Sequence, residues 1–231
     1  MSHSDSHQPG PHIENITRVV LRPVATPVPL SLLALGLGSI LLSAVQLKWI
    51  TVQSTPQVAL VILVFVVPLQ ALGTVLCFYI RDVVMATGFG LLTASWAATA
   101  TLLTSGQPGT RNQVLGVLGI AAAVALLVPA SGATSSKPAG ATVMFVASLR
   151  FALTGAYQLG GSNSWQTASA IIGVILVGAA LYAAAAFLLE DARHHRVLPV
   201  SRRSTSRYAM SGDLGHQLDT LPAEAGVRQE S

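Results

Sequence analysis

Six long apolar stretches, separated by short polar connections, fill the chain between Pro29 and Leu189. A hydrocarbon core about 30 Å thick requires roughly 20 helical residues at 1.5 Å each, and every stretch is close to that length. Because lipid offers backbone N–H and C=O groups no partner, each stretch must close its own hydrogen bonds as a helix. The pattern therefore predicts an all-α membrane protein with six transmembrane helices, at residues 29–47, 58–80, 83–104, 114–130, 139–159 and 166–189.

The connections on the two sides of the predicted bundle differ in charge. Arg81 and Lys137 lie in the second and fourth connections, whereas the opposite side holds only Lys48 and Arg111. Further basic residues flank the bundle on the side of the chain ends, at Arg18, Arg22, Arg193, Arg196, Arg202, Arg203 and Arg207. Basic connections stay in the cytoplasm. Both termini are therefore predicted to be cytoplasmic and Asn163 external, as an even number of spans requires.

Composition agrees with this class and narrows the partners. Hydrophobic residues make up 52% of the chain and charged residues 10%, with a mean hydropathy of +0.61. The net charge of +4 arises mostly at the flanks of the bundle, so it indicates contact with the lipid bilayer rather than with nucleic acid. We predict a polar tail over residues 1–25, a six-helix domain over 26–198 and a disordered basic tail over 199–231.

Residues that usually carry chemistry are sparse in the predicted spans. Cys77 is the single cysteine, which leaves no intrachain disulfide. The sequence shows no Ser/His/Asp set, no spaced cluster of metal ligands and no phosphate-binding loop. We therefore expect no metal, no cofactor and no enzymatic activity.

Arg150 is the exception, because it falls near the middle of the fifth predicted span. A charge at that depth is costly unless it faces protein or water, so its default interpretation is functional. The other five predicted spans contain no Asp, Glu, Lys or His, and an anion is then its natural partner. The alternative is a structural arginine that is tied to backbone carbonyls or a neighbouring helix, or that extends along a tilted helix towards the interface.

The segment that opens the first span, Thr26-Pro27-Val28-Pro29-Leu30-Ser31-Leu32, resembles the Asn-Pro-Ala-Pro-Leu-Gly-Leu signature of the acetate uptake transporter family. Pro27 and Pro29 fit the start of a helix, where N–H groups have no intrahelical partner. The resemblance extends over about residues 24–200. Further matches are Gln70, Thr87, Phe89, Trp96, Ser148, Leu149, Ala180, Tyr182 and the closing Val197-Leu198-Pro199.

This resemblance implies a six-helix protomer in the plasma membrane that assembles into a homo-oligomeric ring, a hexamer, with a separate pathway for a small monocarboxylate in each protomer. It places the narrow part of that pathway at positions matching Leu35, Leu92, Leu149 and Ala180. Apolar side chains there would exclude large or strongly hydrated ions. Candidate hydrogen-bond donors to the anion, besides Arg150, are Thr26, Gln70 and Tyr182.

The sequence also departs from the family pattern. Thr26 and Ser31 replace the asparagine and glycine of the signature, and Leu92 replaces a tyrosine. Two family glutamates are replaced by Cys77 and Phe187, which removes the usual carriers of a coupled proton.

Three hypotheses remain at this point. The leading one is a transporter or channel-like facilitator for a small organic anion such as acetate, with proton coupling left open. The second is a non-transporting oligomeric membrane module that acts through its cytoplasmic tails. The third is a pathway for ammonium or a neutral small molecule, which fits an apolar pore but not a central arginine.

Overall fold

The computed structural model describes residues 25–134, 137–193 and 198. Within these residues the chain is helical, and six helical spans are long and apolar enough to cross a membrane. The prediction of an all-α membrane protein with six spans is thereby confirmed. The spans are α1 (Val28–Gln46), the compound span α2 (Thr55–Val61), η3 (Ile62–Val66) and α3 (Val67–Tyr79), then α4 (Val83–Ser105), α5 (Gln113–Ala133), α6 (Pro138–Gln158) and α7 (Asn163–Arg193).

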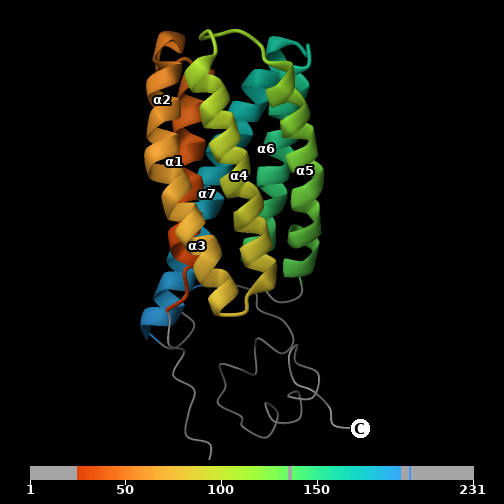
Figure 1. The fold of residues 1–231 in the computed structure, drawn as a ribbon. Coiled ribbons are helices and arrows are strands. Elements are labelled where there is room, and N and C mark those ends of the chain that lie inside the picture. Colours follow the sequence, from red (N-terminus) through yellow and green to blue (C-terminus); the bar gives the residue numbers. More distant parts are fainter. Residues whose placement is uncertain (1–24, 135–136, 194–197, 199–231) are drawn as a thin grey trace, which may run out of the picture.

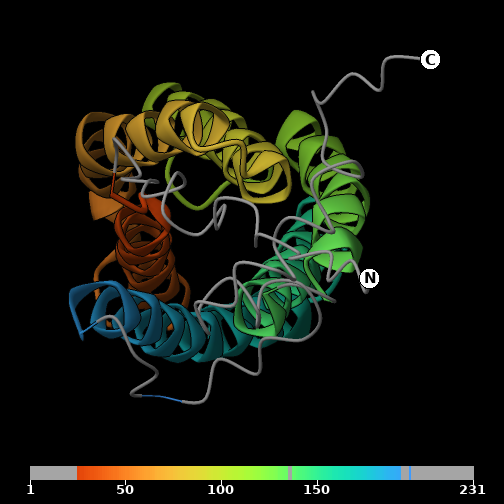
Figure 2. The same ribbon diagram turned by 90° about the horizontal axis from the view of Figure 1, so that it is seen from below.

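The spans form a closed ring (Figure 2). Each packs on its neighbours in chain order, and α7 returns to pack along most of α1, which completes the circle. Figure 1 shows the helices running side by side along one axis, as short connections require. The core fills the inside of this ring. Its largest fully buried side chains include Leu35, Phe89, Leu92, Leu126, Met144 and Leu176.

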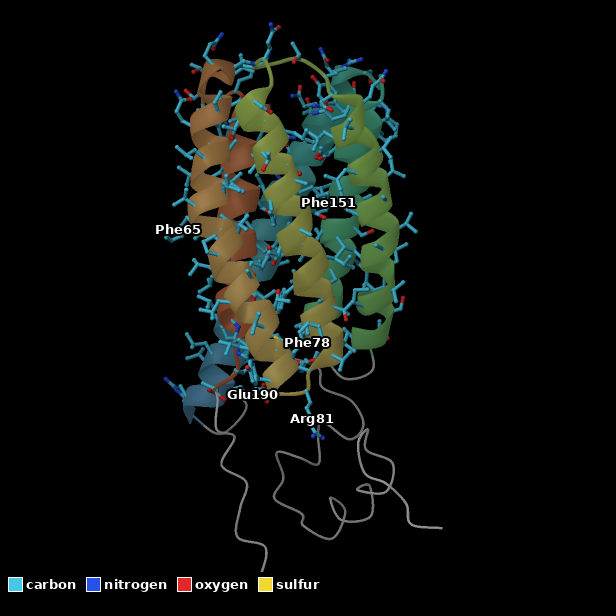
Figure 3. The ribbon with its side chains drawn as sticks, in the orientation of Figure 1. Phe65, Phe78, Arg81, Phe151 and Glu190 are labelled. Carbon is cyan, nitrogen blue, oxygen red and sulfur yellow. The ribbon has the colours of Figure 1, made fainter. Side chains whose placement is uncertain are left out.

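The second span departs from α-helical geometry in its middle. Pro68 has no N–H to donate, and its ring crowds the carbonyl four residues earlier. The preceding residues Ile62–Val66 form a π-helical turn, which accommodates an extra residue. A short 3-10 turn, η2 (Val52–Ser54), leads into the span, which therefore begins a few residues before the predicted position 58. Figure 3 shows Phe65, which belongs to the π-helical turn η3, projecting from the side of the bundle.

Side chains tie the connections together at both ends of the ring. Asp82 caps α4 by accepting a hydrogen bond from the Met85 N–H at 3.3 Å, and it pairs with Lys137 at the start of α6. At the opposite end Asn112 caps α5 through the Leu115 N–H, while its own N–H donates to Gln158 Oε1 at 2.9 Å. These contacts hold the α3–α4 hairpin to α6, and the start of α5 to the end of α6.

The last helix is longer than its apolar stretch. The sequence predicts a span over 166–189, whereas α7 extends over Asn163–Arg193 and buries the side chain of Glu190, which is 3% exposed. The expectation that the five spans other than the fifth lack carboxylates holds for the apolar stretches but not for the helix. The hydropathy falls after Leu189, yet the helix continues to Arg193. Figure 3 places Glu190 at the same end of the bundle as Arg81.

Helix α1 begins and helix α7 ends at the same end of the bundle (Figure 1). The predicted tails over 1–25 and 199–231 lie, apart from Ala25, outside the described residues.

The orientation in the membrane remains a prediction with a direct test. Arg81 and Lys137 lie at the end where α7 terminates, and basic connections stay inside. We expect a reporter fused after Ser231 to be active only in the cytoplasm, and a tag inserted at Asn163 to react with an impermeant reagent from outside. An external carboxyl-terminal reporter would contradict this orientation.

Candidate functional site

Two adjoining cavities lie inside the ring. The first, here called the vestibule, has a volume of about 80 Å³ and is lined by residues near the helix ends, including Gln46, Tyr157 and Gln158. The second, the arginine cavity, has about 30 Å³ and is lined by Leu35, Trp96, Phe151, Arg150 and Leu176, among others. Residues common to both linings are Leu42, Thr99, Leu115 and Thr154. The two cavities therefore follow one another from one end of the bundle towards its middle.

Arg150 lies at the deeper of these cavities, on α6, and is 4% exposed. Its guanidinium carbon is 5.9 Å from the ring centroid of Trp96 on α4, a cation–π distance. On the α7 side it packs against Gly173. A Cβ on Gly173 would come within 2.8 Å of Arg150 Cζ and would overlap Ser43 Oγ of α1. Four helices therefore meet around one guanidinium group, and the glycine makes room for it.

Several buried donors on the helices that meet at this guanidinium have no acceptor in the described part of the chain. Nη1 and Nη2 of Arg150, Nε1 of Trp96 and the hydroxyls of Ser39 and Ser43 are buried, with no hydrogen-bond partner among the described residues. Other hydroxyls in the same bundle behave differently, since Ser95 donates to the Leu91 carbonyl at 2.7 Å. Buried donors are normally paired, because an unpaired one loses its hydration without compensation. We call Arg150, Trp96 and Ser43 the donor cluster.

The backbone-carbonyl explanation of Arg150 does not match these contacts, whereas its cation–π contact with Trp96 does tie it to a neighbouring helix. Its terminal nitrogens reach no carbonyl oxygen in the described part of the chain. The carboxylate of Glu190 lies on α7 about 25 Å beyond Gly173, at 1.5 Å per residue. The ion pair of Asp82 with Lys137 belongs to the helix ends. Within the described residues the charge therefore faces a low-dielectric cavity without a nearby counter-ion, an arrangement that attracts a small anion.

The sequence-predicted pathway residues fall into two groups. Leu35, Leu92 and Ala180 are fully buried inside the ring, and Leu35 lines the arginine cavity. Leu149 and Tyr182 instead lie on the outer surface, 48% and 44% exposed. The structure thus brings Leu35 and Arg150 together and turns the two exposed side chains away from the interior.

The predicted donors lie apart from the arginine cavity. Gln70 is fully buried on α3, and its Nε2 donates to the Ser31 carbonyl at 3.4 Å. Thr26 is half-buried just before α1. Within the signature, Pro27 occupies the N-cap position of α1 without a side-chain capping bond, Pro29 lies in the first turn and Leu30 follows it. This segment therefore positions α1 against α3 at the end of the bundle opposite the vestibule.

Ser43 and Gly173 were not identified as site residues from the sequence, and Trp96 was noted only as a family match. Serine, glycine and tryptophan are ordinary constituents of transmembrane helices. A signal was available in the spacing of Ser39 and Ser43, one helical turn apart on α1, but it does not reveal that their hydroxyls are unpaired.

Both the sequence and the fold resemble those of known proteins. The sequence model of the GPR1/FUN34/yaaH family matches residues 8–202. Among solved structures, the bacterial acetate channel SatP matches with a TM-score of 0.68 and 21% sequence identity, over 77% of this chain and 99% of that chain. At this identity the likeness establishes a shared fold. A search of curated proteins found no match.

Proposed function

Because the chain belongs to the GPR1/FUN34/yaaH family, we propose that it forms a pathway for a small organic anion, such as acetate, across the plasma membrane. Transport rather than catalysis is the role that a six-helix ring with an axial cavity supports. The observation that carries the proposal is the Arg150 guanidinium, which is buried at the arginine cavity and whose two terminal nitrogens have no partner among the described residues.

Electrostatics favours an anion over the alternative cargo. At an effective dielectric constant of about 20, two unit charges 4 Å apart interact with about 4 kcal/mol. That energy attracts an anion to Arg150 and repels ammonium by a similar amount. The hypothesis of an ammonium pathway is therefore the weaker of the two.

The cavity lining also bears on the type of anion. Leu35, Leu42, Leu115 and Leu176 present apolar side chains beside the guanidinium. One cation among apolar walls suits one carboxylate with a short alkyl group, whereas a second carboxylate would have to be desolvated without a partner. SatP, which has the same fold, is an acetate channel. A small monocarboxylate is accordingly the proposed substrate class.

Uptake of radiolabelled acetate by proteoliposomes, with and without a proton gradient, tests this function. We expect saturable uptake above that of protein-free liposomes, and a dependence on the gradient would establish proton coupling. Folded protein that passes labelled methylammonium but not acetate would overturn the proposal.

We also propose that the protein is a homo-oligomer, a hexamer by its family resemblance. The outer surface offers a place for a neighbouring copy, because Gly178 on α7 is exposed and has open space around it, and small residues let membrane helices approach closely. Native mass spectrometry in mild detergent should detect the hexamer. A stable monomer that retains acetate uptake would contradict this prediction.

A further inference from the structure

We propose that Arg150, Trp96 and Ser43 form an equilibrium binding site for one small monovalent anion. This inference rests on the proposed function in identifying the occupant as an anion, but it adds two ligands from other helices. It also predicts binding that can be measured without a membrane. The donor cluster lies where α1, α4, α6 and α7 converge on the guanidinium.

The chemistry of the three groups selects an acceptor with negative charge. A guanidinium carries only donors, and its planar fork matches the two oxygens of a carboxylate. The indole N–H is a donor without acceptor capacity, and a hydroxyl rotates to donate. All of these atoms are buried and lack a partner in the parts of the chain that the structure describes. An anion accepts from donors of this kind, whereas a cation or a further donor satisfies none of them.

Two observations assign Ser43 as a ligand rather than as a helix-surface serine. Its hydroxyl makes no bond to the carbonyl one turn earlier, although most hydroxyls of this bundle do so. The same point of α7, the position of a Cβ on Gly173, is occupied by Ser43 Oγ and lies 2.8 Å from Arg150 Cζ. The hydroxyl and the guanidinium are therefore neighbours across a glycine, close enough to share one occupant.

Charge and space define the ligand class. The cluster contains one cation and an apolar surround, so it suits a monovalent ion. The cavity volume of about 30 Å³ corresponds to roughly two water molecules. A halide and the carboxylate group of a short-chain acid share the required chemistry. Sulfate and gluconate do not fit, because the first is divalent and the second is large and polyhydroxylated.

The test is a titration of the purified full-length protein in detergent with acetate or chloride, each added to a gluconate background. Isothermal titration and the midpoint of thermal unfolding give two readouts of the same binding. We expect saturation by acetate, by chloride or by both, and no response to sulfate. Ser43→Ala and Trp96→Phe should each weaken the affinity about tenfold, the effect of losing one hydrogen bond to a charged ligand. Arg150→Leu should abolish it.

Ser95→Ala is the matched control. Ser95 is a buried serine on the helix of Trp96, but its hydroxyl is already used by the Leu91 carbonyl. Its removal should leave anion affinity unchanged. A preference for acetate over chloride would identify the site as a carboxylate site, and the reverse would identify a halide site.

Two results would overturn the inference: no saturable binding to the folded wild type, or binding that neither Ser43→Ala nor Trp96→Phe weakens. The proposed function has a separate outcome. Saturable binding with no acetate uptake in proteoliposomes would reject transport and leave the site in place. Uptake without this binding would reject the site and leave transport in place.

Discussion

Replacing Arg150 with leucine should lower acetate flux through proteoliposomes by roughly 10- to 100-fold, the loss expected when a hydrogen-bonded charge partner of about 1.5–3 kcal/mol is removed. The stability of the folded protein should not fall. Substituting an uncompensated buried charge with a hydrophobic residue of similar size is often neutral or stabilising. We therefore expect an unchanged or raised Tm alongside the lost flux, both measured on the same purified sample.

Two further variants serve as controls for this result. Arg150→Lys keeps the charge but not the planar fork, so flux should be intermediate. Leu149→Ala changes the adjacent residue, whose side chain lies on the outer surface, and flux should remain that of the wild type. Unchanged flux in a stable Arg150→Leu oligomer would assign this arginine to packing and end the functional interpretation.

Gly155→Ala should strongly destabilise the bundle, by roughly 1–3 kcal/mol for an added group in a filled space. A Cβ at this position of α6 would approach the Gly116 carbonyl oxygen at 2.8 Å and the Ile120 nitrogen at 2.9 Å, both backbone atoms of α5. Backbone atoms cannot rotate aside as a flexible side chain can. The α5–α6 pair is the most extensive helix contact of the ring, so loss of this approach should lower both the Tm in detergent and the yield of folded protein.

Gly36→Ala provides the comparison for that effect. Its added Cβ would meet the Ala180 Cβ at 3.8 Å, an ordinary van der Waals distance. The same substitution on another buried helix should therefore leave the Tm within a few degrees of the wild type. Equal losses in the two variants would show that helix glycines act through backbone flexibility rather than through close approach.

The sequence was sufficient for the class of fold and for the most informative residue. Six apolar stretches specify six helices, because lipid leaves the backbone no other way to satisfy its hydrogen bonds. Arg150 is conspicuous for the same reason, since charge is rare in such stretches. What hydropathy does not show is where a helix ends, and Glu190 was consequently placed outside the last span although α7 buries it.

The orientation of side chains was harder to predict from the sequence. These helices are apolar on all sides, so periodicity does not distinguish the face towards the ring interior from the face towards lipid. A family offset identifies Leu149 and Tyr182 without saying which way they point. The roles of Ser43 and Trp96 depend on hydrogen bonds that are not made, which is a property of three-dimensional geometry rather than of residue type.

Closure of the ring by α7 against α1 bears on the genetics of the protein. The donor cluster is assembled from the helices of a single chain, so in the proposed homo-oligomer a defective copy would lose its own conduction and leave that of its neighbours intact. Substitutions in the cluster should therefore be recessive. A substitution on the outer surface that traps copies in the wrong arrangement would be dominant, because it spreads its defect to every copy in contact with it.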